Sequence, residues 1–232
     1  MWVYIWTWTP EPTPILYANY TFDDQSNSQI TDTSGNWKNL TWGTMPTYSL
    51  VSGTNYAWVF TNANTSALAP SVSVVSLGSD FTELVWVKAT ASSQSYISCV
   101  KGINNQDGIS HQISLIWNYN SWQFEYFDEK DVNDVPTIKR YTIKSSASLN
   151  TWYLIGFVRS NNWETVKTYF NWALVGTNTS NTSGIDKTLN LWSSEVGDRF
   201  RGQIWECFMA EWEFTDADVL NYYNQTKGNY GL

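Results

Sequence analysis

The run of residues 197–212, GDRFRGQIWECFMAEW, constrains the fold of this chain more than any other stretch. Two sets of side chains alternate along it, and both are largely apolar: Trp205, Cys207 and Met209 on one side, and Ile204, Glu206, Phe208 and Ala210 on the other. A strand with two apolar faces needs cover on both sides. We therefore expect this run to be a central, closing strand, around which the rest of the chain builds a sandwich.

Short apolar runs separated by turn residues recur along the chain, which is typical of a β-sandwich. We expect strands over residues 15–22, 56–62, 81–89, 96–101, 109–117, 122–127, 141–143, 152–159, 165–170 and 173–175, with an acidic loop at 128–134. A helix is expected over Asp216–Thr226, with Thr215 as its N-cap, Asp218 in the capping-box position and Gly228 at its end. A length of 232 residues suits one all-β domain.

An N-terminal strand on a stiff arm precedes this domain. In residues 1–9, MWVYIWTWT, four aromatic side chains share one side of the expected strand: Trp2, Tyr4, Trp6 and Trp8. Spaced prolines in residues 10–14 favour an extended spacer. We therefore divide the chain into an arm, residues 1–14, and a domain, residues 15–232. The strand can complete its own sheet or dock onto a neighbouring subunit. We expect the second, which joins copies of the chain into a homopolymer.

The composition argues against nucleic acids and membranes as partners. The net charge is −8, and the longest run of basic residues is Lys139-Arg140, so the chain offers little of the basic surface that nucleic acids and anionic lipids require. The apolar start at residues 2–8 is too short to span a bilayer and has no basic flank. We therefore expect neither nucleic-acid binding nor membrane insertion.

The polar residues indicate a protein that works outside the cell. Charged residues make up only 15% of the chain and aromatic residues 17%. Six sequons offer N-glycosylation sites at Asn19, Asn39, Asn64, Asn178, Asn181 and Asn224. A chain rich in Asn, Ser and Thr also forms such triplets by chance, so both interpretations stay open. We expect an extracellular, cell-surface or virion-surface location.

The two cysteines, Cys99 and Cys207, allow one disulfide. It would close a loop on the order of 100 residues and could contribute roughly 4–5 kcal/mol of stability. The alternative is a pair of buried free thiols.

Several motifs, taken in their order along the chain, resemble the concanavalin A-like lectin/glucanase superfamily, and within it are most similar to laminin-G-like jelly rolls of secreted and surface proteins. They are Tyr20-Thr21-Phe22-Asp23, Asp32-Thr33-Ser34-Gly35-Asn36, residues 81–87 with Trp86, residues 152–158, Tyr169-Phe170-Asn171, Phe200-Arg201-Gly202-Gln203-Ile204, and a capped helix ending in Tyr222-Tyr223. The resemblance covers residues 15–227. It implies an all-β fold, a two-sheet antiparallel jelly-roll sandwich, here with an N-terminal extension strand and one short C-terminal helix.

The resemblance also implies a role in adhesion or glycan binding and, in some members, a calcium ion. Candidate calcium ligands are Asp23, Asp24 and Asp32, because calcium takes carboxylate oxygens. The alternative is that these are solvated loop residues. The family often has an acidic residue where this chain has Trp205. That departure argues against a family-type metal site in the closing strand.

The catalytic branch of the superfamily uses a strand that bears Glu, Asp and Glu for retaining glycoside hydrolysis. Here Glu206 and Glu211 flank Phe208 instead of an acidic residue. We therefore expect a protein that is not an enzyme and has no catalytic residues.

Three tryptophans occupy turn positions where a small residue is expected: Trp37, Trp163 and Trp172. Asn171-Trp172 stands where Asn-Gly is usual, because both central residues of that turn have positive φ. Three interpretations compete. The rings stack on a sugar or on a neighbouring subunit; or the turns are of another type; or the source organism decodes a codon differently, and some of these residues are not tryptophan in the natural protein.

From the sequence we expect a non-catalytic extracellular jelly-roll protein that acts in adhesion and self-assembly at a cell surface, filament or virion. The expected contacts with a neighbouring subunit are the four aromatic residues of the arm, and the expected loop contacts are the three turn tryptophans. The alternatives are a monomeric carbohydrate-binding lectin module and a glycoside hydrolase.

Overall fold

The computed structural model describes residues 15–21, 31–35, 39, 47–52, 55–61, 75–76, 80–91, 95–104, 110–118, 120–132, 135–160, 164–180, 189–196 and 200–230. The strands are β1 (Ile15–Tyr20), β2 (Thr47–Ser52), β3 (Asn55–Phe60), β4 (Val75–Ser76), β5 (Phe81–Ala89), β6 (Ser95–Asn104), β7 (Ser110–Asn118), β8 (Gln123–Val132), β9 (Val135–Lys144), β10 (Tyr153–Ser160), β11 (Thr165–Phe170), β12 (Ala173–Thr179), β13 (Leu189–Val196) and β14 (Gly202–Glu211). Helix α1 is Asp216–Thr226, and a short 3₁₀ helix, Lys227–Tyr230, follows it.

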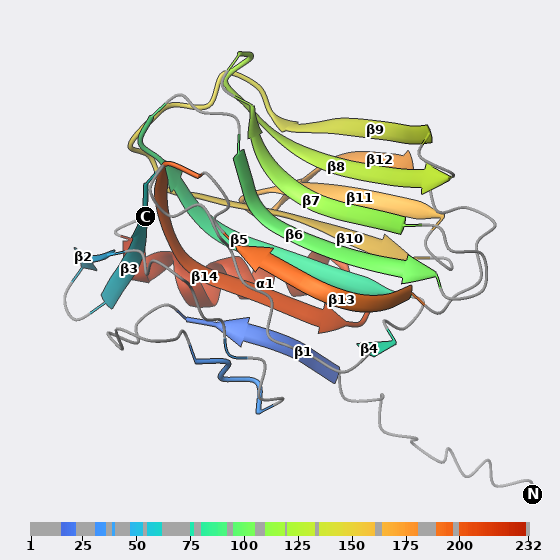
Figure 1. Ribbon diagram of the computed structural model, residues 1–232. Coiled ribbons are helices and arrows are strands. Elements are labelled where there is room, and N and C mark those ends of the chain that lie inside the picture. The colour runs from blue at the N-terminus through green and yellow to red at the C-terminus, as the bar shows by residue number, and fades with distance from the viewer. Residues whose placement is uncertain are drawn as a thin grey trace, which may run out of the picture.

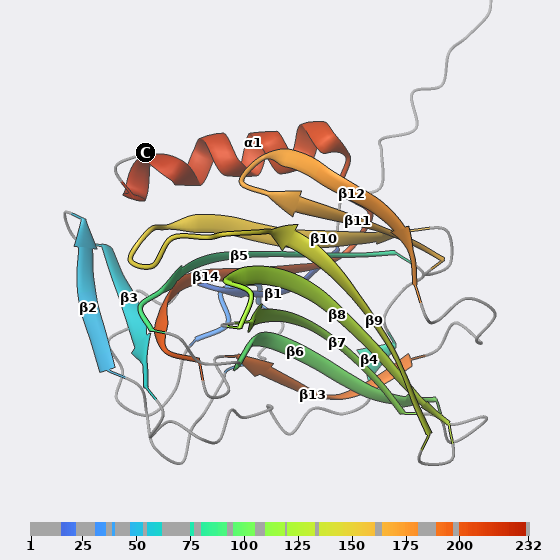
Figure 2. The ribbon, with the colours of Figure 1, turned by 90° about the horizontal axis from the view of Figure 1, so that it is seen from above.

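The described strands form two antiparallel sheets that pack face to face (Figure 1). The first sheet runs β12-β11-β10-β5-β14-β3-β2, with β1 also paired to β14, and the second runs β4-β13-β6-β7-β8-β9. Seen from above, α1 lies over the outer face of the first sheet, so the molecule has three layers (Figure 2). The expected two-sheet jelly-roll sandwich with one C-terminal helix is confirmed.

Strand β14 is the structural centre that the sequence predicts. It pairs with β5, β3 and β1, and both of its faces are buried. One face, with Ile204, Cys207 and Met209, belongs to the core between the sheets, whereas Trp205 belongs to the cluster beneath α1. The expected alternation is therefore wrong at Ile204 and Trp205, because a bulge between Ile204 and Glu206 shifts the side chains by one position.

Helix α1 begins and covers the first sheet as expected. Thr215 is its N-cap, and the reciprocal bonds of a capping box join Thr215 and Asp218. On the sheet side, the indole nitrogen of Trp86 donates to Thr226 Oγ1 at 2.9 Å, and the Trp86 ring stacks on Tyr223 with ring centroids 5.6 Å apart. The α-helix ends at Thr226, as expected, and the chain continues in 3₁₀ form from Lys227 through Tyr230, so that Gly228 lies within this short helix.

Other strands are longer than their sequence pattern predicts. The expected acidic loop at 128–134 begins inside β8, which runs to Val132, and β9 begins at Val135 rather than at Tyr141. Strands β2, β4 and β13 were not expected at all. Of the helices in the part of the chain that the structure describes, none is long and apolar enough to cross a bilayer.

Of the two alternatives that the sequence leaves open for the cysteines, the structure does not form the disulfide, since Cys207 is free and buried. Cys207 lies on β14 of the first sheet and Cys99 on β6 of the second. Facing sheets are typically about 10 Å apart, whereas a disulfide joins Cα atoms about 4.4–6.8 Å apart. Burial, and to a lesser degree the nearby carboxylates of Glu83 and Glu206, raise the pKa of the Cys207 thiol well above its usual value. It is therefore a protonated core side chain.

Candidate functional site

The outer face of the second sheet carries a compact group of polar and aromatic side chains on β7, β8 and β9. Along β8, Phe124 and Tyr126 belong to the core between the sheets. Because side chains alternate along a strand, Glu125 and Phe127 point to the opposite, outer face. Arg140 of β9 lies directly across from Phe127 in the strand register. This outer face is therefore aromatic and charged at the same place.

In this group the Arg140 guanidinium lies over the Phe127 ring and next to the Glu125 carboxylate. Arg140 Cζ lies 5.0 Å from the centroid of the Phe127 ring, and Arg140 Nη1 lies 3.4 Å from Glu125 Oε2. The other carboxylate oxygen of Glu125 accepts a hydrogen bond of 3.0 Å from Asn118 Nδ2. The Arg140 side chain is 39% exposed and that of Glu125 only 7%. The Arg140 guanidinium is therefore partly exposed to solvent, while its contacts with Glu125 and Phe127 fix its orientation.

Such a set can bind neutral polyols. A guanidinium has five N–H donors in a fixed plane and remains charged at any physiological pH. Its free edges can donate to hydroxyl oxygens, while Glu125 beneath it holds the guanidinium in place. We name Asn118, Glu125, Phe127 and Arg140 the outer-face cluster. Sequence reasoning missed it, because Asp128–Asp134 was expected to be a loop and β9 to begin at Tyr141.

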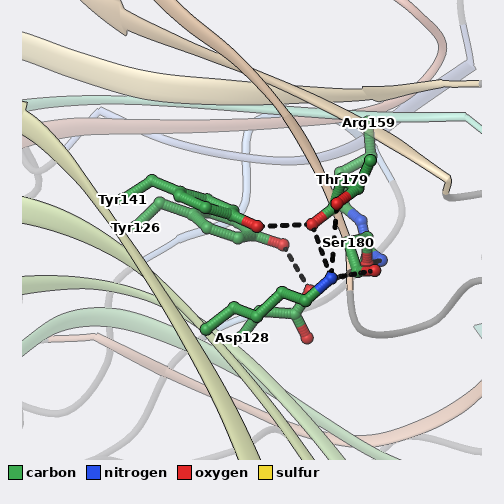
Figure 3. A network of polar contacts seen from close by, with 7 residues as sticks. Tyr126, Asp128, Tyr141, Arg159, Thr179 and Ser180 are labelled. Carbon is green, nitrogen blue, oxygen red and sulfur yellow. Dashed lines mark hydrogen bonds and ion pairs between the residues drawn. The ribbon is translucent and has the colours of Figure 1, made fainter.

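A second polar group lies between the sheets, where the end of β12 meets β8 and β9 (Figure 3). Asp128 and Arg159, both fully buried, face each other with 3.9 Å between Asp128 Oδ2 and Arg159 Nη2. The Ser180 hydroxyl accepts from Arg159 and donates to Asp128 Oδ2 at 2.8 Å. The Tyr126 hydroxyl donates to the same oxygen at 3.2 Å. Residues from three elements thus converge on one carboxylate oxygen.

Two further contacts close this side of the sandwich. The Tyr141 hydroxyl donates to the carbonyl oxygen of Thr179 at 2.5 Å, and Lys139 Nζ donates to the carbonyl oxygen of Ser180 at 3.0 Å. Tyr126 stacks on Tyr141 with centroids 6.0 Å apart. Burial raises the pKa of both tyrosines, that of Tyr126 well above its usual value, so both hydroxyls remain protonated donors. The network therefore ties edge strand β9 to the end of β12, and its role is structural.

The predicted loop contact Trp172 lies at the tip of the β11–β12 hairpin and is 52% exposed. Its backbone differs from the expectation: Asn171 has φ 56°, but Trp172 is not among the residues with positive φ. The expected need for positive φ at both turn positions is therefore wrong, and the turn is of another type. The other two predicted loop contacts, Trp37 and Trp163, lie outside the described residues. So do the four predicted docking residues of the arm, Trp2, Tyr4, Trp6 and Trp8.

Asp32 is the described member of the predicted calcium set, since Asp23 and Asp24 lie outside the described residues. Its Oδ1 accepts from the backbone nitrogens of Asn19 and Ser34 at 3.0 and 2.9 Å, and its Oδ2 accepts from the Ser34 hydroxyl at 2.8 Å. The carboxylate therefore fastens the turn at 32–35 to β1. Across the described ranges, no group of three His, Cys, Asp or Glu side chains is placed to hold a metal. Calcium binding stays a prediction.

The predicted glycosylation sites differ in exposure. Asn224 is exposed on α1, whereas Asn19 and Asn178 are half-buried in β1 and β12. Asn39 is also half-buried, and its Oδ1 accepts from the backbone nitrogen of Asp32 at 2.9 Å. Asn64 and Asn181 lie outside the described residues. Among the described sequons, Asn224 is the most accessible to a glycosyltransferase.

No family model and no curated protein sequence matches the chain. Solved structures do match it. Domain 4 of AbnA, a GH43 extracellular arabinanase from Geobacillus stearothermophilus in complex with arabinotriose, has a TM-score of 0.61 at 20% identity, over 90% of this chain and 98% of that one. Trypanosoma rangeli sialidase in complex with sialic acid has a TM-score of 0.58 at 9% identity, over 94% of this chain and 34% of that one.

The botulinum neurotoxin type G receptor binding domain also matches, with a TM-score of 0.57 at 14% identity, over 90% of this chain and 51% of that one. This chain therefore spans about a third to a half of the sialidase and toxin chains but nearly all of the arabinanase domain. At such identities the likeness concerns the fold alone. It agrees with the two-sheet jelly-roll β-sandwich described above.

Proposed function

We propose that this protein is a non-catalytic, laminin-G-like jelly-roll module that binds carbohydrate outside the cell, at a cell, filament or virion surface. The observation that carries the proposal is the outer-face cluster, in which Arg140 is held over Phe127 and Glu125 with much of its side chain exposed. The arabinanase domain, which this chain matches over 98% of its length and which is in complex with arabinotriose, supports it. The sialidase in complex with sialic acid supports it less directly, because the match covers 34% of that chain. The low charge density and the exposed sequon at Asn224 support the extracellular location.

The test of carbohydrate binding is a glycan array followed by calorimetric titration with the best glycan, with arabinotriose and sialic acid as defined probes. We expect Arg140→Ala to weaken binding tenfold or more, because hydrogen bonds to charged groups contribute about 1.5–3 kcal/mol. Lys167→Ala is the matched control: it also removes one positive charge, but from the first sheet, where Lys167 pairs with Glu213 at 3.3 Å. Equal binding by Arg140→Ala and the unchanged protein would rule out the cluster, and an array without any bound glycan would rule out the function.

We propose self-assembly as a second function, in which the N-terminal strand of one copy docks onto the sheet of another. The observation that favours it is the edge strand β12, whose residues 173–179, ALVGTNT, contain no charge and no proline. Leu174 and Val175 are 42% and 45% exposed there. Natural edge strands are usually protected by charge or proline. The edge strand β9 of the second sheet, with Pro136, Lys139 and Arg140, follows that rule.

Deleting residues 1–14 tests this assembly. We expect the shortened chain to sediment as a folded monomer, because the strand that adds to a neighbouring sheet is gone. A synthetic peptide of residues 1–14 should then bind the shortened chain, and Val175→Lys should weaken that binding by placing a charge on the β12 edge. Assembly that persists after the deletion would exclude the arm as the connecting element. Peptide binding unaffected by Val175→Lys would keep the arm but exclude β12 as its acceptor.

A further inference from the structure

The backbone at Trp122 has a conformation that favours glycine. Trp122 is the last residue of the β7–β8 hairpin loop, and its φ is 53°. Among the described residues, the other non-glycine positions with positive φ are Ser146, Asn150 and Asn171. Asn is enriched at positive φ and Ser is small, whereas for a bulky side chain such a φ is a genuine outlier. Hairpin loops of three to five residues commonly place glycine at a position with positive φ.

The Trp122 ring has few contacts that would explain its presence. It is 43% exposed, and its described aromatic contact is an edge-on one to Trp117, with centroids 6.2 Å apart. The hairpin is secured by the backbone instead: the carbonyl oxygen of Trp122 accepts from Ala147 N at 2.9 Å, and Asn118 pairs with Gln123. A glycine at position 122 would keep both backbone contacts.

Trp86 represents the opposite kind of tryptophan. Its ring is fully buried, its indole nitrogen donates to Thr226, and it stacks on Tyr223. No smaller residue could make these contacts. The chain therefore contains tryptophans that the packing requires and at least one where the backbone favours glycine. The chain also contains more tryptophan than glycine, 15 residues against 13. Three more tryptophans, Trp37, Trp163 and Trp172, each come directly after typical turn residues.

We infer that position 122 is glycine in the protein as its source organism makes it, and that Trp86 is a true tryptophan. Both kinds arise in one sequence when two codons have been translated as tryptophan and the source reads one of them as glycine. The positive φ at position 122 carries this inference. It goes beyond the proposed function, because the outer-face cluster contains no tryptophan.

Peptide mass spectrometry of the protein purified from its source organism tests the inference. The peptide that contains position 122 should have the mass calculated with glycine, and the peptide that contains position 86 the mass calculated with tryptophan. A tryptophan mass at position 122 would overturn the inference. A glycine mass at both positions would overturn the division into two kinds. The same digest gives the masses of the peptides that contain positions 37, 163 and 172 and of those from the arm. These masses decide which of the predicted loop-contact and docking residues are tryptophan.

Recombinant variants test the backbone argument separately. At most positions in a hairpin or strand, alanine is more stabilising than glycine. At position 122 the order should be reversed, so Trp122→Gly should melt at a higher temperature than Trp122→Ala. Trp172 is the matched control, because it is also exposed at a hairpin tip but lacks positive φ; there Trp172→Gly should melt no higher than Trp172→Ala. The same order at both positions would contradict the backbone argument.

Discussion

Replacing Gly156 with alanine is expected to lower the free energy of unfolding by about 3 kcal/mol or more, the upper end of the cost of overpacking a core. Gly156 lies in β10, directly across from Leu84 of β5. A β-carbon at this position would lie 2.3 Å from the carbonyl oxygen of Glu83 and 2.5 Å from Leu84 Cδ2. The first of these atoms belongs to the backbone of a central strand, so it cannot move aside without breaking the sheet.

Gly228→Ala is the control for this prediction. A β-carbon there meets no atom within 4 Å, and the residue lies in the 3₁₀ helix at the end of α1. We expect its effect to stay within about 0.5 kcal/mol, as is usual for surface substitutions. Urea unfolding followed by tryptophan fluorescence measures both variants. Equal midpoints for Gly156→Ala and Gly228→Ala would contradict the close approach of β10 and β5.

The elements that sequence reasoning predicted well are those in which one local pattern decides the structure. Strands β5 and β11 and helix α1 begin and end at the expected residues. Strand β5 is largely apolar on both faces, which is typical of a buried central strand. For α1, the capping box at Thr215 and Asp218 fixes the first turn without help from tertiary contacts.

The elements that were missed depend on contacts that are distant in sequence. Asp128 lies in an acidic run, EYFDEKDVND, which reads as a solvated loop. In the structure it is fully buried, because Arg159 and Ser180, 31 and 52 residues away, bring it a charge and a hydroxyl. Once Asp128 is accommodated, β8 extends to Val132 and β9 can pair with it from Val135 onward. No pattern in the sequence around Asp128 predicts that Arg159 and Ser180 are its partners.

The outer-face cluster was missed for the same reason. Arg140 and Phe127 are adjacent only because β8 and β9 pair over their full length. With β9 expected to begin at Tyr141, Arg140 had no predicted neighbour across the sheet. The candidate binding site therefore depends on the long β8–β9 pairing, and that pairing depends on the buried network that ties β9 to the end of β12. The stability of this network thus bears on the site.

Replacing Arg159 with methionine should accordingly lower the free energy of unfolding far more than the loss of one ordinary hydrogen bond would. Asp128 and Arg159 are both fully buried, and removing Arg159 leaves a carboxylate without its buried counter-charge. Breaking a buried pair in this way costs about 3–5 kcal/mol. Lys167→Met is the matched control: it breaks the partly exposed Lys167–Glu213 pair, so we expect a loss of less than about 1 kcal/mol. Urea unfolding curves measure both.

The double variant Arg159→Met, Asp128→Leu separates the charge from the packing. If the uncompensated carboxylate causes the loss, the double variant should be more stable than Arg159→Met alone, because no charge remains buried at positions 128 and 159. Its recovery should be partial, since Tyr126 and Ser180 also donate to Asp128 and lose their acceptor. A double variant less stable than Arg159→Met would mean that the hydrogen bonds to Asp128, rather than the ion pair, hold β8 and β9 to the end of β12.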